Sequence, residues 1–193
     1  MKKILIFLLF VASLSLNAQQ DVKLGDLYTF EDGSKGIVFY VDEGGHGLVV
    51  SLQQEKRRWD DETNFVYCQD IVNITNEKKV SLNMIVGLGK NNTSYIIGQL
   101  GKNKALAAKY SRDEGVEWYL PSAGELFQLI ARANLYGEID ESLMNNNGKK
   151  IKGWYWTSSE YNNGEAWRIN ENGKVKRCSK LATRIYVRAI REF

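Results

Sequence analysis

Positively charged residues gather near the carboxyl-terminal end of the chain, where they could attract an anionic ligand. Residues 149–193 contain 11 Lys and Arg against 4 Asp and Glu, whereas residues 19–148 contain 13 against 19. An Asn172–Gly173 pair lies between two extended runs and predicts a β-hairpin. Because strand side chains alternate between two faces, Lys174 and Lys176 should lie on one side of that hairpin.

Four cations of this segment are our candidate ligand-binding residues: Lys174, Lys176, Lys180 and Arg184. We expect them to form a positive face that attracts a polyanion, such as a sulfated or uronic-acid glycan. Two simpler interpretations stay open. Lysines on a sheet edge also prevent strand-to-strand aggregation, and Arg188 and Arg191 would use up the excess charge if they paired with the acidic first part of the domain.

Few residues could support catalysis or hold a metal. His46 is the only histidine and lies in a glycine-rich turn, so a catalytic triad lacks a convincing base. One histidine and two distant cysteines cannot supply the usual zinc ligands. The acidic run at residues 60–62 could bind calcium only weakly, and we interpret it as a solvated loop. We therefore expect a protein that is not an enzyme and uses no cofactor or metal.

The first eighteen residues have the three zones of a secretory signal peptide. Lys2 and Lys3 precede an apolar run at residues 4–12, and small or polar residues then lead to Ala18. We expect cleavage after Ala18, which leaves residues 19–193 as one domain that is periplasmic, surface-exposed or extracellular. No later run is apolar over eighteen residues, so we expect no transmembrane segment in the mature chain.

Two cysteines, Cys68 and Cys178, occur in this chain, which is predicted to be exported. An oxidising compartment allows a disulfide between them. The alternative is two buried thiols that act as small apolar residues.

The predicted elements run in the order strands, helices, strands, which favours the α+β class. Three apolar runs within residues 24–53, separated by glycine-bearing turns, predict an antiparallel meander. Residues 93–110 favour helix, although two glycines leave open whether there is one helix or two. Ser122 and Glu125 have the spacing of a capping box at the start of a further helix. Strands near residues 153, 165, 174 and 184 should complete a mostly antiparallel sheet with two helices and long loops.

Four sequence blocks resemble a bacterial C-type-lectin-like domain family of unknown function. They are WYLPSAGELFQLI from Trp118, GWYWTSSEY from Gly153, AWRINENGKV from Ala166 and YVRAIREF from Tyr186. The amino-terminal strands, from Gly25, resemble the same family, and the blocks are more distantly similar to formylglycine-generating and related sulfatase-modifying enzymes. The resemblance implies a C-type-lectin-like fold, a secreted or surface location, and ligand binding in some members.

The residue types in these blocks indicate structural roles and not catalytic ones. We interpret the tryptophans as mainly core residues: Trp118, Trp154, Trp156 and Trp167. The enzymes of the distant resemblance need a close pair of late cysteines, whereas Cys178 has no such neighbour. Sugar-binding C-type lectins carry a calcium motif with a proline between polar residues, whereas Pro121 follows a leucine.

We therefore expect an exported, non-catalytic ligand-recognition domain, adhesin-like, that binds a glycan, another cell-surface polymer or a surface protein, and no nucleic acid. One alternative is a structural or assembly component of a cell-surface protein complex. Another is a degenerate relative of the sulfatase-modifying enzymes.

Overall fold

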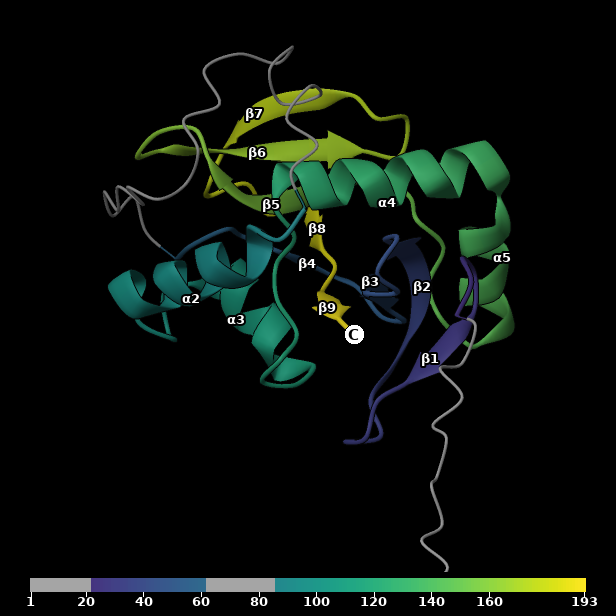
Figure 1. Ribbon diagram of the computed structural model, residues 1–193. Helices are drawn as coiled ribbons and strands as arrows, with labels where there is room; N and C mark the ends of the chain where they lie inside the picture. Colours follow the sequence, from purple (N-terminus) through teal and green to yellow (C-terminus); the bar gives the residue numbers. More distant parts are fainter. Residues whose placement is uncertain (1–21, 62–85) are drawn as a thin grey trace, which may run out of the picture.

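The computed structural model describes residues 22–61 and 86–193, which form two β-sheets and four helices (Figure 1). The predicted signal peptide at residues 1–18 lies outside the described residues, and so does Cys68. The α+β class and the mainly antiparallel pairing are confirmed. The prediction of two helices is wrong, because the described part of the chain contains four.

The first sheet is the predicted amino-terminal meander closed by the last strand of the chain. Its order is β1 (Leu27–Thr29), β2 (Lys35–Val41), β3 (Gly47–Ser51) and β9 (Ile190–Glu192), and each neighbouring pair is antiparallel. All five residues of β3 are buried. This burial explains the continuous apolar run in the sequence, since β3 lies between β2 and β9 and is covered on both faces.

The second sheet has the order β4 (Glu55–Arg57), β8 (Ile185–Val187), β5 (Trp154–Glu160), β6 (Glu165–Asn170) and β7 (Val175–Ser179). The β5–β8 pair is parallel and the other pairs are antiparallel. The sequence suggested one final strand from residue 184, but the strand is interrupted at Arg188 and Ala189. Consequently β8 joins the second sheet and β9 the first, so this short segment links the two sheets.

The helices are α2 (Gly89–Leu100), α3 (Leu106–Asp113), α4 (Ala123–Tyr136) and α5 (Glu138–Asn145). The predicted capping box starts α4: Ser122 accepts from the Glu125 amide, and the Glu125 carboxylate accepts from the Ser122 amide at 2.7 Å. Glu125 also accepts from Gly87 N at 2.8 Å, which ties the entry of α2 to α4. Burial raises the pKa of this carboxyl.

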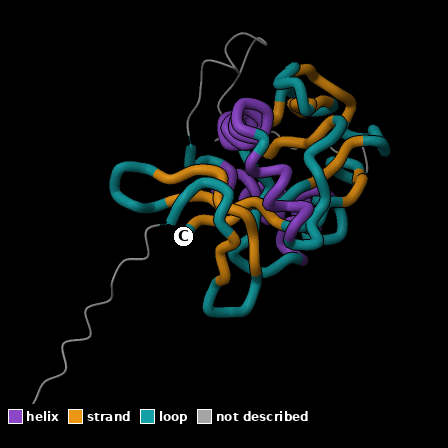
Figure 2. Tube along the Cα trace, turned by 90° about the vertical axis from the view of Figure 1, so that its right-hand side faces the viewer, coloured by secondary structure: helices purple, strands orange, loops and turns teal. Residues whose placement is uncertain are grey.

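Helix α4 packs on β2 of the first sheet and on β5 and β6 of the second (Figure 1). Figure 2 views α4 nearly along its axis, with strands on both sides of it. Helices α2 and α3 pack on each other and against β5 and β8, away from α5. No described helix is long and apolar enough to cross a membrane.

Within the described part of the chain, the buried apolar residues form three clusters. One lies under α4 and α5 and contains Trp167, the second lies between α2, α3 and the second sheet and contains Trp156, and the third contains Trp118. These three tryptophans are buried, as predicted, whereas Trp154 is half-buried. Trp154 is thus the only one of the four predicted core tryptophans that is not fully buried.

Candidate ligand-binding face

The β6–β7 hairpin presents the two lysines whose spacing predicted a charged face. Residues 171–173 form a three-residue loop, closed by bonds from Asn170 N to Lys174 O and from Gly173 N to Asn170 O, with Gly173 at a φ of 74°. The Asn170 side chain accepts from Lys174 N at 2.8 Å and fixes the start of β7. Lys174 and Lys176 are exposed on either side of the buried Val175. This arrangement agrees with the predicted alternation.

Next to Lys176, the strand register brings in a cation and an aromatic ring that we had not singled out as site residues. Arg168 on β6 pairs with Lys176 on β7 and with Trp156 on β5. The Arg168 guanidinium lies diagonally over the ring of Trp154, with its central carbon 4.2 Å from the ring centroid. Ring, guanidinium and ammonium therefore follow one another across three adjacent strands.

Stacking, rather than a carboxylate, holds the Arg168 guanidinium. Its Nε is buried and has no hydrogen-bond partner among the described residues. None of the described carboxylates lies within 4.0 Å of Arg168, Lys174 or Lys176. We call Trp154, Arg168, Lys174 and Lys176 the cationic face. Its positive charges are not neutralised within the described structure, so they can attract an anion.

Lys180 does not belong to this face, which corrects its placement in the sequence analysis. Its side chain is buried, forms an ion pair with Glu160 and lies over the ring of Trp59, with Nζ 4.4 Å from the centroid. Lys180 follows β7 at the end opposite Lys174. A buried lysine of this kind is retained because a carboxylate compensates its charge.

Arg184 is exposed and precedes β8. Strands β7 and β8 run in the same direction, so Arg184 and Lys174 lie at the same end of the sheet. Two strands separate β8 from β7, which at the usual strand spacing corresponds to roughly 14 Å. A single small anion could not contact both residues, whereas a polymer could span them.

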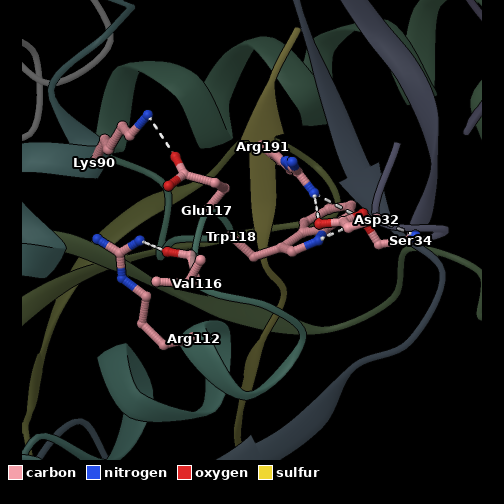
Figure 3. Close-up of polar contacts among 8 residues, drawn as sticks. All are labelled: Asp32, Ser34, Lys90, Arg112, Val116, Glu117, Trp118 and Arg191. Carbon is pink, nitrogen blue, oxygen red and sulfur yellow. Dashed lines mark hydrogen bonds and ion pairs between the residues drawn. The ribbon is translucent and has the colours of Figure 1, made fainter. Parts of the chain in front are cut away.

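Two arginines of the basic segment, Arg188 and Arg191, already have hydrogen-bond partners within the domain. Arg191 lies 2.6 Å from Asp32 and also donates to Ser34 Oγ at 2.8 Å (Figure 3). Arg188 is buried and donates to the carbonyl oxygens of Ser51, Leu52 and Lys149. Burial lowers the pKa of Arg188. The interpretation that both arginines pair with acidic residues thus holds for Arg191, whereas Arg188 is held mainly by backbone oxygens.

Arg177 shows that charge on the opposite side of β7 is compensated. Its guanidinium is 3.7 Å from the Glu165 carboxylate and lies over the Tyr161 ring. The uncompensated charge is therefore on the side of Lys174 and Lys176.

The remaining candidate residues do not form a catalytic or metal-binding site within the described residues. Cys178 is half-buried, and because Cys68 lies outside the described residues the disulfide stays a prediction. His46 is exposed in a turn where Asp42 accepts from its backbone amide at 3.0 Å. Within residues 22–61 and 86–193, His, Cys, Asp and Glu form no group of three that could hold a metal. Asp60 is buried, so the interpretation of residues 60–62 as a solvated loop is wrong at this position.

The fold and this face together define an α+β domain with a cationic sheet surface beside a half-buried aromatic ring. No family model matches the sequence, and a search of curated proteins found no match. Among solved structures, the fold is similar to the crystal structure of a fimbrial protein from Bacteroides ovatus ATCC 8483, with a TM-score of 0.63 and 19% sequence identity. The match covers 89% of this chain and 49% of that protein, so the chain spans about half of its length.

Proposed function

We propose that this protein is an exported, non-catalytic ligand-recognition domain whose cationic face binds an anionic glycan. The observation that carries the proposal is the set of uncompensated cations, Arg168, Lys174 and Lys176, beside the half-buried ring of Trp154. Arginine and lysine donate charge-assisted hydrogen bonds to carboxylate or sulfate groups, and the indole offers apolar surface to a sugar ring. The similarity of fold to a fimbrial protein supports a role at the cell surface.

A heparin column tests this proposal with a matched pair of variants. Lys174→Glu with Lys176→Glu reverses two charges of the cationic face, whereas Lys35→Glu with Lys149→Glu makes the same change at exposed lysines elsewhere. We expect the first double variant to elute at clearly lower salt than the wild type, because screened charge attraction carries the retention. The control should elute closer to the wild type. Equal elution of both double variants would reject the cationic face.

A second candidate function is a structural component of a surface assembly. It is favoured by the position of β7, which pairs with β6 and has no second partner among the described strands, and by the fimbrial protein of similar fold. Sedimentation over a range of protein concentrations distinguishes the two functions. Concentration-dependent oligomers that are insensitive to Lys174→Glu and Lys176→Glu, without heparin retention, would favour assembly.

Export and the lectin-like relationship are part of the proposal. The four sequence blocks beginning at Trp118 support the resemblance to bacterial C-type-lectin-like domains. Mass spectrometry of the protein from its native cells should find an amino terminus near Gln19. An intact Met1 to Ala18 segment would contradict export by this route.

A further inference from the structure

An open groove of about 450 Å³ lies between α2 and α3, away from the cationic face. Its volume is within the range of ligand-binding clefts. The residues that matter for its chemistry are Ile97, Gly98, Lys102, Lys109, Arg112 and Val116.

The groove has an apolar part that is accessible to a partner. The side chain of Val116 is 76% exposed, more than Met144 at 53% or Leu27 at 39%. Ile97 is half-buried beside it, and a Cβ built on Gly98 would meet nothing within 4 Å. The surface of α2 is thus open at Gly98, and an aliphatic group placed there would remove apolar surface from water.

Three cations surround this apolar part. Lys109 is paired with Asp113 at 2.8 Å, but Lys102 and Arg112 have no carboxylate within 4.0 Å among the described residues. The Arg112 guanidinium is held in place, because it donates to Ser94 Oγ at 2.8 Å. It also donates to the carbonyl of Val116, the contact that Figure 3 shows. Because these hydrogen bonds already restrict the guanidinium, an anion that approaches it loses little further side-chain freedom on binding.

We infer that this groove binds an acidic segment of a partner protein in which an aliphatic side chain lies next to carboxylates. The aliphatic side chain would contact Val116 and Ile97, and the carboxylates would face Lys102 and Arg112. The two cations are on different elements, Arg112 on α3 and Lys102 in the turn after α2, so an extended segment matches them better than one small anion. This inference does not depend on the glycan-binding proposal.

The test uses two acetylated and amidated hexapeptides, Gly-Glu-Leu-Glu-Val-Gly and its counterpart with glutamine in place of both glutamates. Each is titrated into isotope-labelled protein while the amide resonances are followed by NMR. We expect the acidic peptide to shift the resonances of Ile97, Gly98 and Val116, and the glutamine peptide to bind at least about threefold more weakly, because it lacks the charges.

Two exposed substitutions then locate the site. Lys102→Glu and Val116→Ser should each weaken binding of the acidic peptide by about three- to fivefold, through lost charge attraction and lost apolar contact. The matched controls Lys35→Glu and Met144→Ser, at exposed positions outside the groove, should leave the affinity unchanged. Spectra of the unbound variants show directly whether each is folded.

Several results would overturn the inference. No saturable shift at the groove, or equal binding of the two peptides, would remove the acidic segment as its ligand. Octanoate that shifts the same resonances with higher affinity than the acidic peptide would identify a small aliphatic carboxylate as the ligand instead. Equal effects of Lys102→Glu and Lys35→Glu would show only general charge attraction.

Discussion

Lys180 and Arg168 are both cations near the β6–β7 hairpin, yet their surroundings give them different roles. Lys180 is buried against Glu160 and Trp59, while Arg168 is half-buried and stacked on Trp154. Sequence spacing alone placed Lys180 in the binding face and did not single out Arg168. A side chain's charge is visible in the sequence, but its compensation depends on which residues the fold brings within 4 Å.

The Lys180→Met variant tests the structural role of this lysine. Removal of the ammonium leaves the Glu160 carboxylate buried without its cation, so we expect a loss of about 3 to 5 kcal/mol in the free energy of unfolding. Urea denaturation measures the loss, and adding Glu160→Leu should recover most of it. If Lys180→Met were as stable as the wild type but failed to bind heparin, the lysine would belong to the ligand site after all.

Asp32 provides a pH-dependent test at the other end of the molecule. Hydrogen bonds from the Ser34 hydroxyl and amide, followed by one from Arg191, lower the pKa of Asp32 to about 2. We expect NMR titration to find this value and Ser34→Ala to raise it more than Arg191→Ala. Because the folded-state pKa is lowered from 3.8, the stabilisation is complete above pH 4 and is lost as the pH falls through about 2. An unshifted Asp32 would contradict the contacts in Figure 3.

At the scale of elements, local sequence signals predicted some features well and others poorly. The capping box at Ser122 and the hairpin loop before Lys174 depend on neighbouring residues, so the sequence contains the necessary information. The division of the last strand at Arg188 does not, since RIYVRAI has the composition of one continuous strand. Arg188 is buried because it donates hydrogen bonds to carbonyl groups that are distant in the sequence, and no local sequence pattern predicts these bonds. Helix α5 was missed because its sequence continues into a polar tract typical of loops.

The capping box allows a quantitative test of α4. Ser122→Ala removes the acceptor for the Glu125 amide, so we expect the free energy of unfolding to fall by about 1 kcal/mol. Gln99→Ala, at an exposed position of α2, should change it by less than about 0.5 kcal/mol. Chemical denaturation of both variants measures the difference. Equal stability of the two would mean that the cap contributes nothing to α4.

At the scale of the whole molecule, the two sheets are joined through the helices and the Arg188–Ala189 segment, and the cationic face lies on the outer part of the second sheet. Strand β5 carries one core tryptophan and one partly exposed tryptophan: Trp156 is buried and Trp154 is half-buried. Because of this difference, we assign Trp156 a role in stability and Trp154 a role in ligand binding. The sequence analysis assigned both rings to the core, but which ring is covered depends on how α2 packs against β5.

The two tryptophans make a matched pair for mutation. Trp156→Ala should lower the free energy of unfolding by about 3 to 5 kcal/mol, because the second apolar cluster loses a fully buried ring that also donates to Arg57 O at 3.0 Å. Trp154→Ala should lower it less, since that ring is already partly in water. Urea midpoints compare the variants, and a larger loss for Trp154→Ala would show that the core is wrongly assigned.

Binding of an anionic glycan to the cationic face can be followed residue by residue in an NMR titration of the isotope-labelled protein with a heparin hexasaccharide. We predict saturable shifts of the Trp154 indole N–H and of the amides of Arg168 and Lys176, with affinity falling as salt rises. The Lys174→Glu, Lys176→Glu variant should lose these shifts. Shifts confined to other surfaces, or no saturable shift at low salt, would contradict the claim.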